Sequence, residues 1–406
     1  MNNSKNNMLE SEDSGVVNFI KKYAILCIFL LVIIFFQVRT KGVLLQPMNI
    51  NSLIQQNSYI LVLAIGMLLV ILTGNIDLSV GSIVAYSSAI CAHMIVNVKT
   101  NIPQGTWVML GMLVALLIGA VAGAWNGLWI SYFKIPAFIV TLSSQLVFRG
   151  LAQGQLKGKT IAPFPDSYTF ISSKFLSDAK INIAGTEFNT LTLIVGIVCV
   201  VAVVAYQFYS RSAKKKAEIH VSSNGAFYLR LLLTVAIIIG FTYLLGVFKG
   251  IPSVLTLLLA LIAIYGFITT KTIPGRHIYA LGGNEKAARL SGINTKSVMF
   301  WVYVNMGVIA ALAGIVFSGR LNAATPQAGD GFELDAIASC YIGGASSSGG
   351  IGTVFGAIIG GLLMGVLNNG MSISGVPVHV QLIVKGLVLL FAVAFDVITK
   401  SKSSKS

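Results

Sequence analysis

The sequence predicts an all-α, polytopic integral membrane protein with about twelve helical segments, within a range of 10–12. Of the 406 residues, 55% are hydrophobic and only 10% are charged, whereas about 25% are charged in an ordinary soluble domain. Charge-free windows long enough to cross a bilayer, about 20 residues, recur along the chain. Runs such as LVLAIGMLLVIL are apolar on every side instead of alternating, which favours helices over a transmembrane β-barrel.

Taken in order, the apolar segments define the expected helices. They centre near residues 23–38, 53–73, 78–97, 107–132, 136–152, 189–209, 228–248, 251–271, 298–319, 335–347, 353–370 and 378–398. The tenth is too short for a complete span, so broken or re-entrant helices are expected. The 41 glycines follow no collagen period and indicate close packing of helices in lipid.

Basic residues give the expected orientation. The formal net charge is +15, but the Lys and Arg residues lie in short stretches between uncharged windows, which is typical of cytoplasmic loops and not of a nucleic-acid-binding surface. Three such stretches, 211–216, 276–296 and 400–405, are expected in the cytoplasm. With both termini inside, a count of twelve segments places all three on that side. Arg39 and Lys41 would then lie outside, against the rule.

The same topology divides the chain. Residues 1–22 form a polar cytoplasmic N-terminus without the cleavage site of a signal peptide, and 399–406 form a basic cytoplasmic tail. The transmembrane domain is 23–398. GAVAG at 119–123 and GAIIG at 356–360 precede similar apolar stretches that run in opposite directions, which an inverted repeat requires. Its halves would be about 50–155 and 250–398, with an inserted helix pair at 189–248; a chance match among glycine-rich helices is the alternative.

No arrangement of residues predicts catalysis or a bound cofactor. QGQLKGKT at 153–160 lacks the first glycine of a phosphate-binding loop and no buried strand precedes it, so we expect no ATP site. The four cysteines and four histidines are scattered without metal-ligand spacing, and no serine lies in a nucleophile elbow. We therefore expect no enzyme and no metal site.

The segment 274–297 predicts a short cytoplasmic helix. Glu285 to Leu290 are good helix formers, Asn284 is placed as the N-cap, and Gly292 is placed to end the helix. A solvated surface turn is the alternative. The pattern of Glu285, Ala287, Ala288 and Gly292 resembles the EAA loop of binding-protein-dependent ABC permeases, whose helix docks in a groove of the cytoplasmic ATPase. The resemblance implies an ATPase-coupling loop made of Asn284, Glu285, Ala287, Ala288, Arg289 and Gly292.

Further stretches extend this resemblance over both halves of the chain. NIDLSVGSIVA (75–85), WNGLWISYFKIPAFIVTL (125–142), GRHIYALGGNEKAARLSGIN (275–294) and GGASSSGGIGTVFGA (343–357) resemble the sugar permeases of the ribose, galactoside and xylose importers. The added helices near 189–248 resemble the xylose and multiple-monosaccharide branch. This likeness implies a monosaccharide permease of the bacterial inner membrane. Its implied partners are a second copy, an ATPase that holds the ATP, and an extracytoplasmic sugar-binding protein.

Charged residues beside the broken segments are candidate helix caps or gate residues. Asp77 precedes the third helix and is placed as its N-cap, while Glu333 and Asp335 precede the short tenth segment, where carboxylates suit a helix N-terminus. Alternatively, Glu333 and Asp335 line the external mouth. Lys385 lies inside the last segment and must pair, line a cavity or extend to the membrane surface.

A neutral sugar requires hydrogen-bonding groups and aromatic faces along its path. Candidates, each equally compatible with a hydrogen bond between helices, are Gln55, Gln56, Asn57, Trp125, Asn126, Gln145, Asn305, Asn368 and Asn369. The first functional hypothesis is an ATP-driven importer subunit. The second is a secondary sugar or solute transporter, or a channel, that acts without an ATPase.

Overall fold

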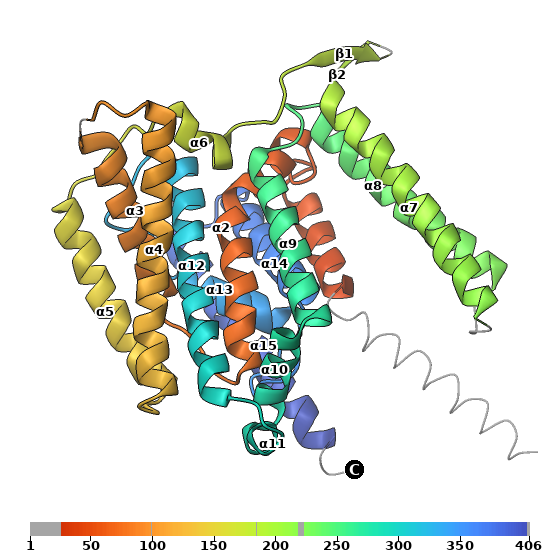
Figure 1. Cartoon of the computed structure of the whole chain (residues 1–406). Helices are drawn as coiled ribbons and strands as arrows, with labels where there is room; N and C mark the ends of the chain where they lie inside the picture. The colour runs from red at the N-terminus through yellow and green to blue at the C-terminus, as the bar shows by residue number, and fades with distance from the viewer. Residues whose placement is uncertain (1–25, 99, 184, 218–222, 404–406) are drawn as a thin grey trace, which may run out of the picture.

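The computed structural model describes residues 26–98, 100–183, 185–217 and 223–403. A helical bundle with one small hairpin accounts for nearly all of these residues (Figure 1). A short apolar helix, Leu26–Arg39, comes first. The elements after it are α2 (Pro47–Leu72), α3 (Val80–Ala92) with its π-helical extension η1 (His93–Asn97), α4 (Gln104–Ser131), α5 (Ala137–Leu156), α6 (Asp166–Ser173), β1 (Lys180–Ile183), β2 (Thr186–Asn189), α7 (Thr190–Lys216), α8 (Asn224–Gly246), α9 (Ser253–Lys271), α10 (Ile273–Gly283), α11 (Glu285–Leu290), α12 (Thr295–Leu321), α13 (Phe332–Ile342), α14 (Val354–Ile373) and α15 (Val378–Ser403).

Each of the twelve predicted segments coincides with one of these helices. Among the described residues, nine helices are long and apolar enough to cross a membrane. The segment at 335–347 is helical only to Ile342 within α13, because Gly343 and Gly344 end the helix and Gly344 adopts a φ of 85°. Residues 1–22, predicted to be a polar N-terminus, lie outside the described residues.

The predicted basic loop after the sixth segment is also partly helical. Lys214, Lys215 and Lys216 form the last turn of α7, where positive charges are stabilised by the free carbonyl groups of a helix C-terminus. The backbone of α15 likewise runs to Ser403 through most of the predicted tail.

The two ends of the bundle are named after the short helix that lies at each: the α6 end and the α11 end. α2 begins near the α6 end, where the Gln55 side chain donates to the Ser173 carbonyl, and finishes near the α11 end, where the Leu72 carbonyl accepts from Gly350 N–H at 2.9 Å. α12 runs the other way, from just after α11 to Ser318, whose hydroxyl bonds Tyr168 of α6 at 2.7 Å. These two central helices are therefore antiparallel.

The helix contacts of α2–α5 match those of α12–α15 when α2 is paired with α12, α3 with α13, α4 with α14 and α5 with α15. The contact of α4 with α12 then corresponds to that of α14 with α2, and the contact of α3 with α12 corresponds to that of α13 with α2. α3 against α5 and α13 against α15 form a further related pair. GAVAG lies in α4 and GAIIG in α14, the two helices that this pairing relates. An inverted repeat requires related helices to run in opposite directions, as α2 and α12 do.

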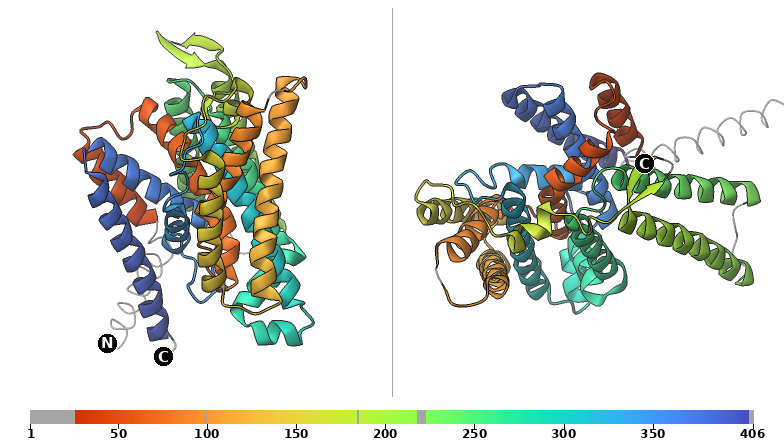
Figure 2. Two further views of the ribbon diagram at one scale, coloured as in Figure 1. Left: turned by 90° about the vertical axis from the view of Figure 1, so that its left-hand side faces the viewer. Right: turned by 90° about the horizontal axis from the view of Figure 1, so that it is seen from above.

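Two short helices begin inside the bundle instead of at its surface. Residues 73–79 return from the α11 end to the start of α3, and residues 322–331 return from the opposite end to the start of α13 (Figure 2). The two starts meet so closely that a Cβ added to Gly81 would overlap the Gly329 carbonyl oxygen, and one added to Gly329 would overlap the Gly81 carbonyl oxygen. α13 corresponds to the tenth segment, which the sequence predicts to be too short for a complete span, whereas the break before α3 was not predicted.

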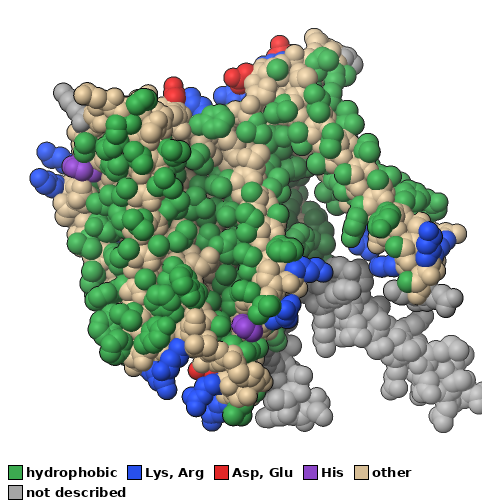
Figure 3. Space-filling view, viewed as in Figure 1, with side chains coloured by type: hydrophobic (Ala, Val, Ile, Leu, Met, Phe, Trp, Pro, Cys, Tyr) green, Lys and Arg blue, Asp and Glu red, His purple; other side chains and the backbone are tan. Residues whose placement is uncertain are grey.

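α7 and α8 form an arm that leaves the bundle (Figures 1 and 2). Only 11% of the apolar window of each is buried, against 83% for α2. The arm joins the bundle at the α6 end, where Asn189 caps α7 and its side chain also donates to the Ser177 carbonyl at 2.6 Å. Hydrophobic side chains cover the visible face between the two charged ends (Figure 3).

The hairpin of β1 and β2 projects from the α6 end beside this arm (Figure 1). Its strands are antiparallel, with Lys180 opposite Asn189. Lys180 pairs with Glu187 at 2.7 Å, and the ammonium group lowers the pKa of the Glu187 carboxyl by favouring its ionised form.

Candidate functional site

Asp77 lies at the start of α3 in a chain of hydrogen-bonded polar side chains. Its Oδ1 accepts from the Ser79 N–H at 2.8 Å and from the Ser79 hydroxyl at 2.6 Å. Asn126 of α4 donates to the Ser79 Oγ at 2.8 Å, and Ser144 of α5 donates to the Asn126 Oδ1 at 2.6 Å. The chain therefore ties the irregular segment before α3 to two neighbouring helices.

The N-cap of α3 differs from the prediction. Ser79 occupies that position, and Asp77 lies two residues earlier, where an Asp side chain readily bonds the N–H two positions along. Asp77 is 1% exposed. Its Oδ2 and the hydroxyl of Tyr303 both lack a hydrogen-bond partner, so the carboxylate has an acceptor atom to spare inside the bundle.

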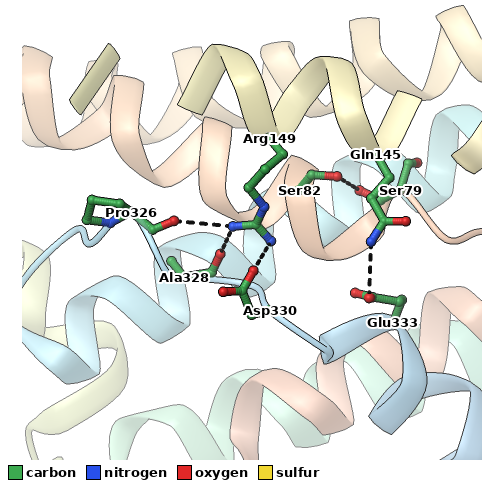
Figure 4. Close-up of polar contacts among 8 residues, drawn as sticks. All are labelled: Ser79, Ser82, Gln145, Arg149, Pro326, Ala328, Asp330 and Glu333. Atoms are coloured by element: carbon green, nitrogen blue, oxygen red, sulfur yellow. Dashed lines mark hydrogen bonds and ion pairs between the residues drawn. The ribbon is translucent and has the colours of Figure 1, made fainter. Parts of the chain in front are cut away.

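Glu333 and Asp335 lie in the first turn of α13, as carboxylates at a helix N-terminus should. Gln145 of α5 donates to Glu333 Oε1 at 3.3 Å (Figure 4). Lys385 of α15 lies 3.1 Å from both carboxylate oxygens of Asp335. The short helix is therefore held on one side by α5 and on the other by α15, and the partner of Lys385 is a residue fifty positions away.

Arg149 fixes the segment that leads into α13. Its guanidinium donates to the Ala328 carbonyl at 2.6 Å and to the Pro326 carbonyl at 3.3 Å, and it pairs with Asp330 at 2.7 Å (Figure 4). Bonds to backbone carbonyls hold irregular chain that has no helical hydrogen bonds of its own. Arg149 therefore stabilises the returning segment 322–331 from α5.

The other predicted path residues do not gather at this site. Asn57 bonds the Leu53 carbonyl within α2 and faces Gly365 of α14. Asn369 exchanges hydrogen bonds with Asn49. Asn305 accepts from the Tyr265 hydroxyl between α12 and α9.

Three more predicted residues also lie apart. Trp125 is exposed on α4 beside Trp129, Asn368 has a buried Oδ1 without a partner, and Gln56 is half-buried in α2. Of the predicted path residues, only Asn126 and Gln145 bond the segments around α3 and α13.

The predicted coupling helix is present as α11. The Asn284 Oδ1 accepts from the Ala287 N–H at 3.0 Å, and the chain leaves the helix at Gly292 with a φ of 85°. Ala288 is buried, whereas Glu285 and Arg289 are exposed. Leu290 is 89% exposed, so α11 presents an apolar side chain at the end of the bundle that no described residue covers.

α10 connects α11 to the end of α2 and to the irregular segment 343–353. No sequence pattern predicted this connection. Tyr279 donates to the Gly352 carbonyl at 2.7 Å. A Cβ added to Gly282 would overlap the Leu72 carbonyl and crowd Gly350 N. The turn before α11 is thus in direct backbone contact with the end of α2 and with 343–353.

These features describe a helical membrane protein with two broken helices at its centre and a short, largely exposed helix at one end. The chain belongs to the family of branched-chain amino acid transport system permease components, whose profile matches residues 49–393.

Individual relatives narrow the comparison. The chain is 40% identical over 381 residues to the xylose transport system permease protein XylH of Haemophilus influenzae, covering 94% of this chain and 97% of that protein. It is 38% identical to XylH of Escherichia coli K12 over 94% and 93% of the two chains. The ribose import permease RbsC of Bacillus subtilis is 36% identical over 87% of this chain and 85% of that protein. No solved structure matches.

Proposed function

We propose that this chain is the membrane-spanning subunit of a binding-protein-dependent ABC importer that carries a monosaccharide into bacterial cells, with D-xylose as the leading candidate substrate. The observation that supports it most is the 40% identity to a xylose permease over 94% of the chain. The described residues include no group of His, Cys, Asp or Glu side chains arranged to hold a metal. The proposal assigns ATP binding to a separate ATPase and no cofactor to this chain.

The partners in this proposal are a second copy of the chain, the cytoplasmic ATPase, the extracytoplasmic sugar-binding protein and the lipid bilayer. The α11 end would face the cytoplasm with both chain termini. Supporting this orientation, α11, the C-terminal end of α15 and the tip of the α7–α8 arm lie away from the α6 end (Figure 1), and all three carry basic residues, as cytoplasmic segments do.

Contacts around α10 supply a route from the ATPase to the broken helices. A displacement of α11 moves Tyr279 and Gly282, which contact 343–353 and the end of α2. Segment 343–353 follows α13, and its Ser347 hydroxyl bonds Asp396 of α15 at 3.0 Å. The motion would reach α13 and α15 through segment 343–353, which contacts α10, α2 and α15.

Uptake of labelled xylose tests the proposal. Cells that make this chain with its ATPase and binding protein should accumulate xylose, and omission of the ATPase should abolish the uptake, because the chain carries no nucleotide site in the proposal. Galactose and ribose serve as comparison sugars. Uptake that persists without the ATPase would instead establish a secondary transporter or channel.

Gly292→Val should detach the ATPase. The φ of 85° at this position strains a β-branched residue by about 1–3 kcal/mol, which should disturb α11 and lower ATPase recovery on copurification several-fold while the chain still inserts. Gly375→Val is the matched control, since Gly375 has a φ of 72° in open space between α14 and α15 at the α6 end. Equal recovery from the two variants would contradict the docking role of α11.

A further inference from the structure

A cavity of about 710 Å³ opens at the α11 end, between the turn from α4 to α5, the start of α12 and α11 itself. Its lining includes Thr73, Gly74 and Asn75 of the segment that leads to α3, but neither Asp77 nor Glu333. Three cations, Lys134, Arg289 and Lys296, line it together with one acid, Glu285. None of the three cations forms an ion pair within the described chain. Three unpaired cations and one carboxylate leave an excess positive charge in one concave site.

Two helix N-termini open into the same cavity. Pro136 and Ala137 at the start of α5 line it, as do Thr295 and Lys296 at the start of α12. The first N–H groups of a helix have no acceptor in that helix, and the aligned peptide dipoles add partial positive charge. On α12 the Asn294 side chain occupies only the N–H of Ser297. The backbone therefore adds further donors for an anion.

Ser131, the last residue of α4, supplies an independent observation. The residue lines the cavity and is only 5% exposed, and its shielded hydroxyl has no hydrogen-bond partner among the described residues. Buried hydroxyl groups are normally paired. A rotation of the Ser131 side chain toward the cavity would let this hydroxyl donate to an acceptor atom there.

The surroundings favour an amphiphilic anion. Ile130, Ile135 and Met299 give the cavity an apolar side, and the rings of Tyr132 and Phe133 beside it are exposed. Aromatic side chains gather at the level of lipid headgroups, and basic pockets between membrane helices at the cytoplasmic side bind anionic headgroups. The apolar side and the exposed rings suit a ligand that carries apolar groups beside its negative charge, which a free ion does not.

We propose that this cavity binds the phosphate of an anionic glycerophospholipid. Lys134, Lys296, the Ser131 hydroxyl and the starts of α5 and α12 would hold the phosphate, while the apolar side contacts the glycerol esters. The proposal rests on the proposed function only for the cytoplasmic placement of the α11 end. Because Glu285 and Arg289 of α11 share the cavity, the lipid would also restrain the helix that docks the ATPase.

Lipid retention measured by native mass spectrometry tests this. The complex, purified in detergent with its ATPase, is given phosphatidylglycerol or phosphatidylcholine. The wild type should retain phosphatidylglycerol preferentially. Lys134→Gln should weaken retention about fivefold, since a basic residue near an anionic surface contributes about that factor, and adding Ser131→Ala should weaken it further. Lys180→Gln, on the hairpin at the other end, is the matched control and should change nothing.

Three outcomes would overturn the proposal. The first is equal retention of the two lipids. The second is competition by inorganic phosphate alone that matches competition by phosphatidylglycerol, which would make the site one for a free anion. The third is reduced ATPase recovery in Lys134→Gln with unchanged lipid retention, which would assign the cations to the partner protein. Lipid retention is read without sugar uptake, so failure of the transport proposal is a separate result.

Discussion

Lys385→Met should destabilise the protein by about 3–5 kcal/mol, because it leaves the Asp335 carboxylate buried without a counter-charge. The carboxylate is 7% exposed and lies 3.1 Å from the Lys385 ammonium, and α13 has no other contact of this kind with α15 among the described residues. The expected result is a large fall in the thermal unfolding temperature in detergent, with loss of transport.

Two further variants separate the charge effect from lost packing. Adding Asp335→Asn to Lys385→Met removes the unpaired charge and should restore most of the stability, since replacing both members of a buried pair is often nearly neutral. Lys174→Met breaks the exposed pair with Asp166 and should cost at most about 1 kcal/mol. If Lys385→Met behaved like Lys174→Met, the pair would have no role in holding α13.

Gly307→Ala should also lower the stability of the protein strongly, because Gly307 lies where α12 crosses α4. A Cβ at Gly307 would overlap the Gly119 carbonyl oxygen and crowd the backbone of Gly123, and a Cβ at Gly119 would overlap the Gly307 carbonyl oxygen. Backbone lies against backbone here, so the helices must separate to admit a methyl group. Overpacking of this kind costs about 1–3 kcal/mol or more, and the measurement is again the unfolding temperature.

Gly266→Ala is expected to change the stability in the opposite direction and serves as the control. Gly266 lies within α9 with open space around it, and Ala is favoured over Gly in a helix by about 0.5–1 kcal/mol. We expect Gly266→Ala to be neutral or stabilising while Gly307→Ala destabilises. The same sign and size at both positions would mean that the α4–α12 contact is looser than the structure shows.

Most helical segments could be predicted from the sequence because they are long and apolar enough to span a bilayer, and length and apolarity alone identify such a helix. The same signal misses α6, α10 and the β-hairpin, which are short or amphipathic and lie near the ends of the bundle. Asn284 as the cap of α11 was predictable because a cap depends on residues three positions apart.

The site was less accessible to sequence reasoning. The link between Lys385 and Asp335 joins residues fifty positions apart, and the link between Gln145 and Glu333 joins residues 188 positions apart; no local pattern encodes such pairs. The amide residues proposed for a path scatter because an Asn side chain in a membrane helix bonds whichever carbonyl or neighbouring helix is within reach, as Asn57 and Asn369 do. A polar side chain inside an apolar window therefore indicated a buried residue, but not where in the bundle that residue lies.

The α7–α8 arm has a consequence for the response to bilayer thickness. The charge-free part of α7, residues 190–210, precedes a basic last turn and is about 30 Å long at 1.5 Å per residue, which matches the thickness of the hydrocarbon core of a membrane. A helix that is too long relieves hydrophobic mismatch by tilting, and this pair is attached to the bundle only near Asn189 and the end of α8. In a thinner membrane the arm can lean further while the central helices keep their packing, so the two broken helices are shielded from changes in bilayer thickness.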